Sequence, residues 1–320
     1  MKRYNSISAG FVSLLAIASV SIAYAAGESE IQVAPRTSPT TTVPSAKPKL
    51  PKTTSGFIPA NIGQSTFPFE GGRNIFGKDD RIPMNSAKYP WSAIGRVEAI
   101  NGNQMDWTCT GTLIGKNLVV TNAHCVVDEK TKQVTTNKIR FRPNLIDGQA
   151  PAAAFATKVV PGTNDPNRDR GNDWALLVLD QPLGETYGWM NFIVADLSDL
   201  DSVKGEIILA GYSSDFPKEK PSETAGVHNG CSIRGFGPQL GMISHDCDMM
   251  SGASGGPMFV VLQEGNKLNA VIIALNAAHR TPQGKPQGAQ VNKFSRETAN
   301  IGVFSAVWAA KAEELLQAQR

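Results

Sequence analysis

Three short motifs, far apart along this 320-residue chain, present a histidine, an aspartate and a serine in a fixed order. Taken singly, each is ordinary: a core histidine, an aspartate at a turn, and a serine in a glycine-rich turn. Their combination in one chain rarely arises by chance, so the fold is expected to bring them together. The motifs are Thr121-Asn122-Ala123-His124-Cys125, Asn172-Asp173-Trp174-Ala175-Leu176 and Gly252-Ala253-Ser254-Gly255-Gly256-Pro257.

These residue types together predict nucleophilic catalysis. A serine hydroxyl is a weak nucleophile near neutral pH until a neighbouring imidazole accepts its proton, and His124 is the predicted base for Ser254. Asp173 is expected to orient the imidazole ring and to stabilise its protonated form. Because Gly252 has no Cβ, backbone N–H groups are free to point at an oxyanion, and those of Gly252 and Ser254 are the predicted donors.

The motif order and the neighbours of each residue resemble the chymotrypsin-like serine proteases. The resemblance implies a serine endopeptidase that cleaves protein or peptide substrates through an acyl-enzyme intermediate, without a cofactor or metal. It also implies an all-β fold of two six-stranded antiparallel Greek-key barrels, and we expect a monomer. Within the family the chain is similar to the bacterial glutamyl endopeptidases from Gly77 to Trp308. The supporting segments are Gly77-Lys78-Asp79-Asp80-Arg81, Tyr89-Pro90-Trp91-Ser92-Ala93-Ile94-Gly95-Arg96 and Gly211-Tyr212.

The four cysteines lack the paired short spacing of zinc ligands, so in an exported chain they predict two disulfides. Three connectivities are possible. The family resemblance favours a bond between Cys109 and Cys125, beside His124. That choice leaves Cys231 to pair with Cys247.

The first residues have the pattern of an export signal. Lys2 and Arg3 precede an apolar stretch at about residues 9–23, and Ala23-Tyr24-Ala25 fits a cleavage site. We therefore expect a signal peptide at residues 1–25 and a secreted or periplasmic protein. An uncleaved signal anchor is the alternative, and no other segment is long and apolar enough to span a bilayer.

Residues 26–74 are rich in proline, threonine and serine and show little apolar periodicity. They predict a propeptide or a flexible linker, with the mature chain starting near Ile75 after a cut that follows Asn74 or Arg73. Without residues 1–74 the chain has 24 basic and 25 acidic side chains, so its formal charge changes from +3 to −1. The basic balance belongs to the leader, and no nucleic-acid partner is expected.

Beyond the leader, short β-branched and aromatic runs separated by turn residues predict strands. We expect a first barrel at residues 75–185, a second at 186–304 and a helix at 305–320. His124 and Asp173 would lie on loops of the first barrel, and Ser254 with the substrate pocket would lie on the second. The expected strands are residues 91–99, 109–114, 117–121, 138–142, 157–160, 174–179, 207–212, 228–233, 240–244, 256–262, 268–276 and 289–291.

Two clues to the substrate pocket disagree. Asp248 lies six residues before Ser254, where trypsin-like enzymes keep a carboxylate that pairs with lysine or arginine. An equally good interpretation of Asp248 is a turn aspartate whose carboxylate caps backbone N–H groups. The glutamate-selective relatives use a histidine on the strand that lines the pocket, where this chain has Asn276, which argues against strict selectivity for glutamate. The two clues together leave a basic residue and glutamate as the alternatives for the residue before the cut. Ala277 is expected to contact extended substrates through its backbone, and His279 is a further pocket candidate.

Ala253 stands where the animal enzymes of the family have an aspartate that pairs with the newly freed N-terminus. That activation switch is therefore absent, and a leader that silences a zymogen must act by another route, such as covering the cleft. Two alternatives to a protease remain. One is a secreted, non-catalytic or chaperone-like binding protein on a protease frame, and the other is a hydrolase of non-peptide esters with the same triad.

Overall fold

The computed structural model describes residues 50, 52–65, 79–194, 200–264, 266–279, 294–295 and 297–319, all within the compact unit Ala46–Arg320. The predicted signal peptide, the cut near Ile75 and the strand expected at 289–291 lie outside the described residues. In the described part of the chain, no helix combines the length and apolar character needed to cross a membrane.

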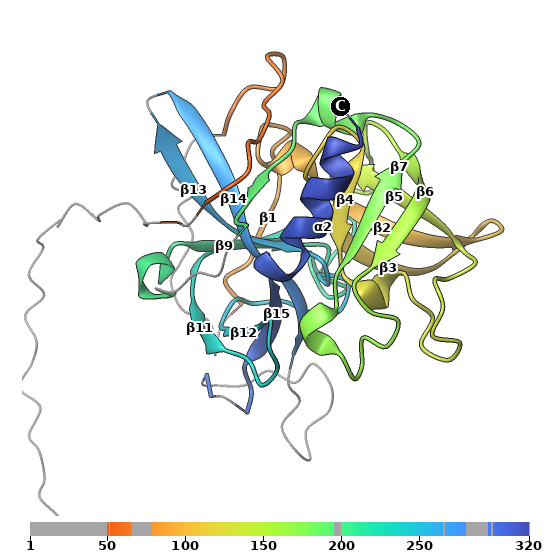
Figure 1. Ribbon diagram of the computed structural model, residues 1–320. Helices are drawn as coiled ribbons and strands as arrows, with labels where there is room; N and C mark the ends of the chain where they lie inside the picture. The colour runs from red at the N-terminus through yellow and green to blue at the C-terminus, as the bar shows by residue number, and fades with distance from the viewer. Residues whose placement is uncertain are drawn as a thin grey trace, which may run out of the picture. The chain divides into compact units, whose positions relative to one another are not determined.

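The first half of the described chain is a closed barrel of six antiparallel strands, in the order β2-β3-β4-β7-β6-β5 (Figure 1). Its interior is filled by alternating apolar side chains such as Ile139 and Phe141 of β5, which are almost completely buried. The strands are β2 (Ile94–Asn101), β3 (Gln104–Leu113), β4 (Leu118–Thr121), β5 (Lys138–Pro143), β6 (Ala154–Pro161) and β7 (Ala175–Leu179).

The second half is a nine-stranded sheet in the order β1-β10-β9-β13-β14-β15-β12-β11, with β8 paired to β14. The predicted all-β, chymotrypsin-like class is confirmed, although this sheet has more strands than the six expected. Two short strands that the sequence did not predict also join the sheet: β1 (Ile82–Pro83) and β8 (Asn191–Phe192). The others are β9 (Ile207–Gly211), β10 (Gly226–Cys231), β11 (Ile233–Phe236), β12 (Met242–His245), β13 (Pro257–Glu264), β14 (Lys267–His279) and β15 (Asn300–Phe304).

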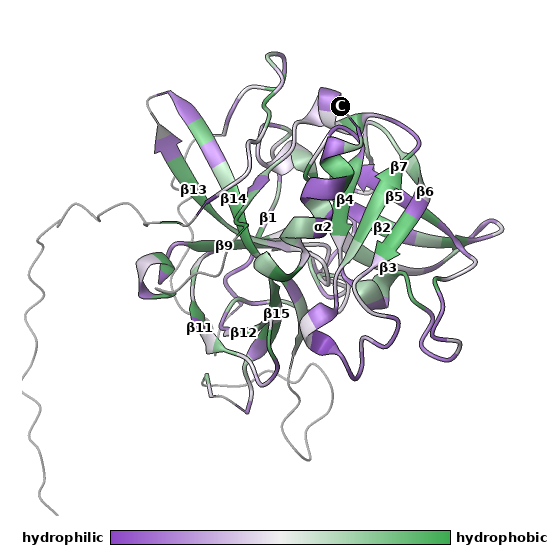
Figure 2. Ribbon diagram, in the orientation of Figure 1, coloured by the Kyte–Doolittle hydropathy of each residue, from purple (hydrophilic) through white to green (hydrophobic). Residues whose placement is uncertain are grey.

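The predicted C-terminal helix is present as α2 (Ala306–Gln317). Trp308, Ala312 and Leu315 recur at helical spacing and are buried, and the Trp308 ring lies 4.8 Å from that of Phe192 in β8. In Figure 2 the strands around α2 are coloured mainly as apolar. The remaining helices are α1 (Leu183–Tyr187) and the 3₁₀ turns η1 (Trp91–Ala93), η2 (Ala123–Cys125), η3 (Arg170–Asn172) and η4 (Leu200–Val203).

Residues 52–65, which fall in the predicted propeptide or linker, pack against the barrel-to-sheet connection. The backbone N–H of Phe57 donates to the Trp189 carbonyl at 3.1 Å, and the Trp189 N–H returns a bond to Phe57 at 3.0 Å. The two rings stack with centroids 4.5 Å apart. Further along, the Ser65 N–H donates to the Tyr89 carbonyl at 2.9 Å. These contacts tie residues 52–65, which we call the strap, to the described domain.

Both predicted disulfides are confirmed, Cys109 with Cys125 and Cys231 with Cys247. Each closes a short loop with a sequence separation of 16. The chain-entropy estimate for a loop of this length is about 3 kcal/mol per bond. The first bond joins β3 to η2 and so fixes the turn that carries His124.

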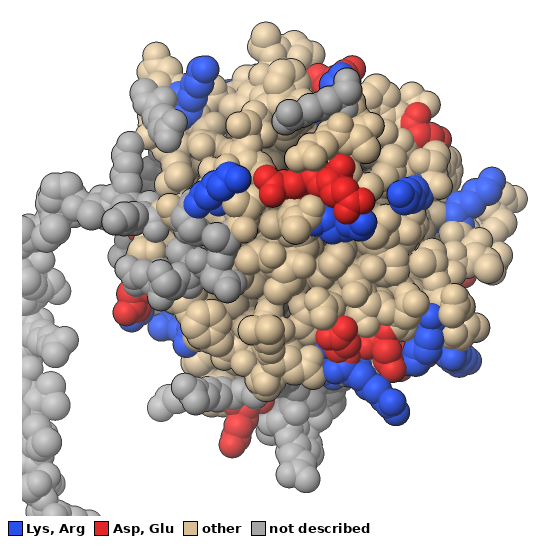
Figure 3. Space-filling view, viewed as in Figure 1, with Lys and Arg blue, Asp and Glu red and all other residues tan. Residues whose placement is uncertain are grey.

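Acidic and basic side chains are interspersed over the face of the molecule seen in Figure 3. Some of them pair directly, as Lys311 does with Glu314 on α2 at 2.6 Å. Such a mixture creates no strong field of one sign over that face.

Candidate active site

His124 and Asp173 come together because their two strands pair. β4 ends at Thr121, opposite Ala175 of β7, so η2 and Asp173, two residues before β7, lie at the same end of the barrel. The Asp173 carboxylate accepts two hydrogen bonds, from the His124 ring Nδ1 at 2.7 Å and from the His124 backbone N–H at 2.9 Å. Asp173 is only 5% exposed, whereas the His124 side chain is 34% exposed. The ring therefore has one buried, anchored edge and one open edge.

The electrostatics of this pair favour protonation of the imidazole. Burial opposes a charged ring, but the negative charge of Asp173 and its hydrogen bond outweigh that effect, and the pKa of His124 is raised above its usual value. With Nδ1 donating to Asp173, Nε2 is left as the acceptor of a neutral ring. The arrangement suits a group that accepts a proton at Nε2 and then carries a positive charge.

Ser254 sits in a turn whose two glycines are required by the backbone. Gly252 and Gly255 have φ of +92° and +79°, values that side chains other than glycine rarely adopt. A Cβ at Gly255 would also lie 2.2 Å from the Thr110 carbonyl oxygen. The Ser254 hydroxyl donates to the Ala277 carbonyl at 3.4 Å, and within the described residues it makes no hydrogen bond with His124.

The backbone around Ser254 leaves particular N–H groups unused. Ala253 N–H donates to the Met250 carbonyl at 3.1 Å and Gly255 N–H donates to the Asn276 carbonyl at 2.8 Å. In contrast, the N–H groups of Gly252 and Ser254 have no acceptor within the described part of the chain. These are the two donors that the sequence predicted for an oxyanion.

A cleft of about 410 Å³ brings the three residues to one surface. Its walls come from the loops of the first barrel, from the loop between β12 and β13, and from β14 and β15 of the second sheet. The lining residues are His124, Val127, Glu129, Pro166, Asn167, Arg170, Asp173, Met249, Ser251, Ser254, Ala277, Ala278 and Ile301.

The predicted pocket residues fall in different places. Ala277 lines the cleft, as expected, and His279 ends β14, where only its backbone is described. Asn276 is completely buried and donates its side-chain N–H to the Ala253 carbonyl at 2.9 Å, so it supports the serine turn from behind. Asp248 is not among the lining residues.

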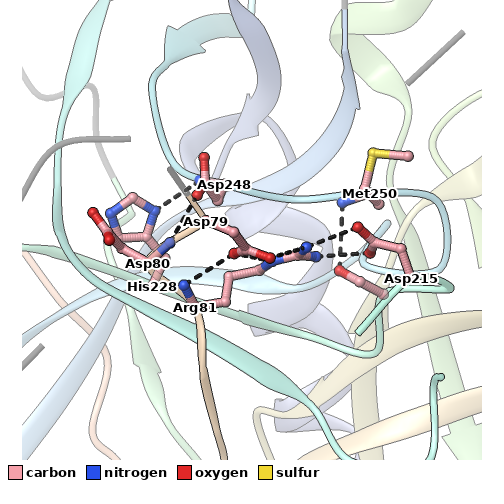
Figure 4. Close-up of polar contacts among 8 residues, drawn as sticks. Asp79, Asp80, Arg81, Asp215, His228, Asp248 and Met250 are labelled. Atoms are coloured by element: carbon pink, nitrogen blue, oxygen red, sulfur yellow. Dashed lines mark hydrogen bonds and ion pairs between the residues drawn. The ribbon is translucent and has the colours of Figure 1, made fainter. Parts of the chain in front are cut away.

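Asp248 instead belongs to a partly buried cluster of charged and polar groups (Figure 4). Its carboxylate accepts the Asp80 backbone N–H at 3.3 Å, and its own N–H donates to Nδ1 of His228 at 2.7 Å. Nearby, Arg81 is held between Asp79 and Asp215, with its guanidinium nitrogens 2.8 Å from a carboxylate oxygen of each. The segment before β1 therefore covers Asp248.

Burial governs the ionisation of this cluster. It raises the pKa of Asp248 to about 7, and the neighbouring carboxylates of Asp79 and Asp80 add to the effect. It also lowers the pKa of His228 to about 3 and that of His245 to about 4. Both histidines are thus neutral near pH 7.

One cluster of potential metal ligands includes His124, but its two cysteines form a disulfide. A ring nitrogen of His124 and the sulfurs of Cys109 and Cys125 lie within 4.8 Å of one another. Because the two sulfurs form a disulfide, neither is available as a thiolate ligand.

Sequence reasoning did not identify Thr110, which ties the serine turn to the first barrel. Its N–H donates to the Ser254 carbonyl at 2.7 Å, and its hydroxyl donates to the Gly252 carbonyl at 2.9 Å. The hydroxyl also accepts the Tyr212 N–H at 2.9 Å. A threonine after a cysteine in a strand carries no local signal of such distant contacts.

Part of the chain is similar in sequence to known peptidases. Residues 109–267 match the family described as trypsin-like peptidase domain. Serine protease 23 of Rattus norvegicus is 27% identical over 249 residues, which is 70% of this chain and 59% of that protein. Chymotrypsin-like elastase family member 1 of Felis catus is 34% identical over 122 residues, 37% of this chain and 43% of that protein.

Solved structures show the same fold at lower identity. A Glu endopeptidase in complex with MPD aligns with a TM-score of 0.56 and 20% identity, and the alignment covers 76% of this chain and 100% of that chain. The thermostable serine protease AL20 aligns with a TM-score of 0.51 and 16% identity, covering 69% of this chain and 94% of that one. The fold, the matched family and the curated relatives together support a chymotrypsin/trypsin-like serine protease. The chain spans about 59% of the length of the first of these curated relatives.

Proposed function

We propose that this protein is a secreted serine endopeptidase in which Ser254 is the nucleophile, His124 the general base and Asp173 the residue that orients it. One observation carries the proposal: His124 and Ser254 line a single cleft, backed by the buried Asp173, beside two backbone N–H groups without an acceptor in the described part of the chain. That set supplies a base, a nucleophile and an oxyanion site together.

In the proposed reaction, Nε2 of His124 takes the Ser254 proton as the hydroxyl oxygen bonds to the substrate carbonyl carbon. The carbonyl oxygen becomes negative and accepts hydrogen bonds from the Gly252 and Ser254 N–H groups. The imidazolium then protonates the leaving amine as the C–N bond breaks, which leaves an acyl-serine. Water, deprotonated by the same ring, releases the acid product and restores the Ser254 hydroxyl.

The surroundings of Asp248 bear on the residue that precedes the cut. Its carboxylate faces the Asp80 N–H, and the nearby cleft wall consists of Met249, Ala277 and Ile301. This supports the turn-aspartate interpretation over a trypsin-like salt bridge with the substrate. We therefore propose that Asp248 does not set the preference for the residue before the cut, and Asp248→Asn is expected to leave that preference unchanged.

We further propose that the protein acts outside the cytoplasm, as a monomer, on protein or peptide substrates. The two disulfides support an oxidising compartment. The division into a signal peptide at 1–25, a leader at 26–74 and an enzyme domain from 75 is part of the same proposal.

The test is expression into an oxidising compartment, determination of the N-terminus of the accumulated protein, and cleavage profiling on a mixed peptide library. A Ser254→Ala variant is profiled beside it. Cleavage that disappears in the variant, with folding retained, supports the serine mechanism. Equal cleavage by both proteins refutes Ser254 as the nucleophile, and an absence of cleavage by both favours the binding-protein alternative.

A further inference from the structure

The charged side chains that line the cleft differ in whether they have an ion-pair or hydrogen-bond partner. Asp173 is paired with His124, and Glu129 accepts a hydrogen bond from the Asn167 side chain at 2.8 Å. The remaining charged lining residue is Arg170, which is exposed. Over the described ranges of the chain, no carboxylate lies within ion-pair distance of its guanidinium. The cleft therefore presents Arg170 as a cation without an ion-pair partner, and Glu129, which pairs with no cation over the same ranges, lies on the same lining.

The backbone that carries Arg170 is held in place by the second sheet. The side-chain oxygen of Gln239 accepts the N–H of Arg170 at 2.9 Å and that of Gly171 at 3.3 Å. The same side chain donates to the Arg168 carbonyl at 2.9 Å. A Cβ at Gly171 would lie 1.9 Å from the Leu240 carbonyl oxygen, so the two loops are in close contact. Arg170 thus projects from a fixed platform.

The guanidinium itself is partly oriented and partly free. Its Nε donates to the Asn167 carbonyl at 3.4 Å, and Asn167 also lines the cleft. The two terminal nitrogens have no acceptor among the residues that the structure describes. Over the described residues the adjacent Asp169 makes no ion pair with it, and both Asp169 carboxylate oxygens accept the Asn172 side-chain N–H, each at 3.1 Å.

A guanidinium with free terminal nitrogens is suited to bind a carboxylate through two parallel hydrogen bonds. Arg170 lies on the first-barrel wall, three residues before Asp173, whereas Met249 and Ala277, which flank Ser254, lie on the opposite wall. The carboxylate is thus not expected on the residue immediately before the cut.

We propose that Arg170 selects an aspartate or glutamate at a substrate position other than the residue that precedes the scissile bond. The proposal rests on the proposed endopeptidase function. It assigns to this cleft an extended acidic peptide as the class of substrate, with the preference set by Arg170 and independent of Asp248.

The test uses peptides cut in the library profile, with the residue before the cut held constant and Asp, Asn or Lys placed at each other position in turn. At one position we expect kcat/KM for Asp to exceed that for Asn by about 3- to 10-fold, the range for a solvent-accessible charged hydrogen bond. Arg170→Gln should bring this ratio within about twofold of unity, and Arg170→Glu should favour Lys.

Arg168→Gln is the matched control, because Arg168 lies on the same loop with its side chain 90% exposed, and it should keep the wild-type ratio. The ratio compares two substrates on one enzyme preparation, so partial loss of folded protein cancels. The preference should also weaken as the salt concentration rises.

A second measurement separates the two proposals. Fluorescence anisotropy of labelled Asp and Asn peptides on full-length Ser254→Ala, with and without Arg170→Gln, reads binding without cleavage. An Asp preference that Arg170→Gln removes supports the inference even if the wild-type protein cleaves nothing, in which case only the proposed function fails. The inference is overturned if cleavage shows the same kcat/KM for Asp and Asn at every position. It is also overturned if no peptide binds, or if the Asp preference survives Arg170→Gln.

Discussion

The hydroxyl of Tyr212 provides a sharp test of how the two halves of the molecule are joined. Tyr212 follows β9 in the second sheet, and Leu145 follows β5 in the first barrel. The hydroxyl accepts the Leu145 N–H at 2.9 Å and donates to the Leu145 carbonyl at 3.2 Å. Both residues are completely buried, so one oxygen satisfies both backbone polar groups of Leu145.

Tyr212→Phe removes that oxygen while keeping the ring, so the change creates almost no cavity. It leaves a buried N–H and a buried carbonyl without their partner, and each such group costs about 1–3 kcal/mol. With two such groups, the free energy of unfolding is therefore expected to fall by about 2–6 kcal/mol. That is a large share of the roughly 5–15 kcal/mol by which proteins are usually stable.

The assay is urea unfolding followed by tryptophan fluorescence, with the denaturant slope fitted for each variant. Tyr187→Phe is the matched control, because the Tyr187 hydroxyl makes no hydrogen bond within the described residues and the residue is only half-buried. It should change stability by less than about 0.5 kcal/mol. A loss below about 1 kcal/mol for Tyr212→Phe, or one equal to the control, would refute the reasoning, since Leu145 would then have other partners.

Three further predictions address the site, its ionisation and the strap. Because the pKa of His124 is raised by Asp173, and the ring must be neutral to accept a proton, kcat/KM should rise with pH through a value above 6.5; Asp173→Asn should lower that value and reduce kcat by about 10⁴-fold. Burial raises the folded-state pKa of Asp248 to about 7, so its contribution to stability is lost as pH rises from about 4 to 7. Asp248→Asn should therefore gain stability relative to wild type over that interval and keep the gain at higher pH, as measured by urea unfolding; a constant difference from pH 4 to 8 would contradict this. Phe57→Ala removes the stack on Trp189, which is worth about 0.5–1.5 kcal/mol beyond the buried area, and should speed proteolytic loss of residues 50–65 while the rest of the domain stays intact; unchanged proteolysis would show that backbone pairing alone holds the strap.

Many of the strands were predictable because their signals are local, whereas the disulfide pairing followed from the family resemblance. β5 alternates buried and exposed residues and is bounded by turn residues, so its range follows from the sequence to within one residue. β15 was missed for an equally local reason. It is a five-residue run, Asn300–Phe304, interrupted by Gly302 and continued directly by α2, and nothing in it separates a strand from the start of a helix.

The pocket was less predictable because its geometry depends on residues distant in sequence. The position of Asp248 follows from its spacing to Ser254, but the direction of its carboxylate depends on Asp80, which is 168 residues earlier. Likewise, Arg170 is one of many surface arginines in the sequence. Its place in the cleft depends on Gln239, 69 residues later, which fixes the loop that bears it. No periodicity or motif encodes such contacts.

The contacts of the serine turn imply that alignment of the proposed triad is a property of the interface between barrel and sheet. Thr110 of β3 bonds the carbonyls of both Gly252 and Ser254, and Gly255 packs against Thr121, the residue that ends β4 before the His124 turn. One wall therefore positions both the nucleophile and the base. Thr110→Val keeps the side-chain shape but removes the hydroxyl. It should thus reduce kcat by a larger factor than its loss of unfolding free energy accounts for. Equal losses of activity and of folded protein would show that Thr110 supports the fold alone.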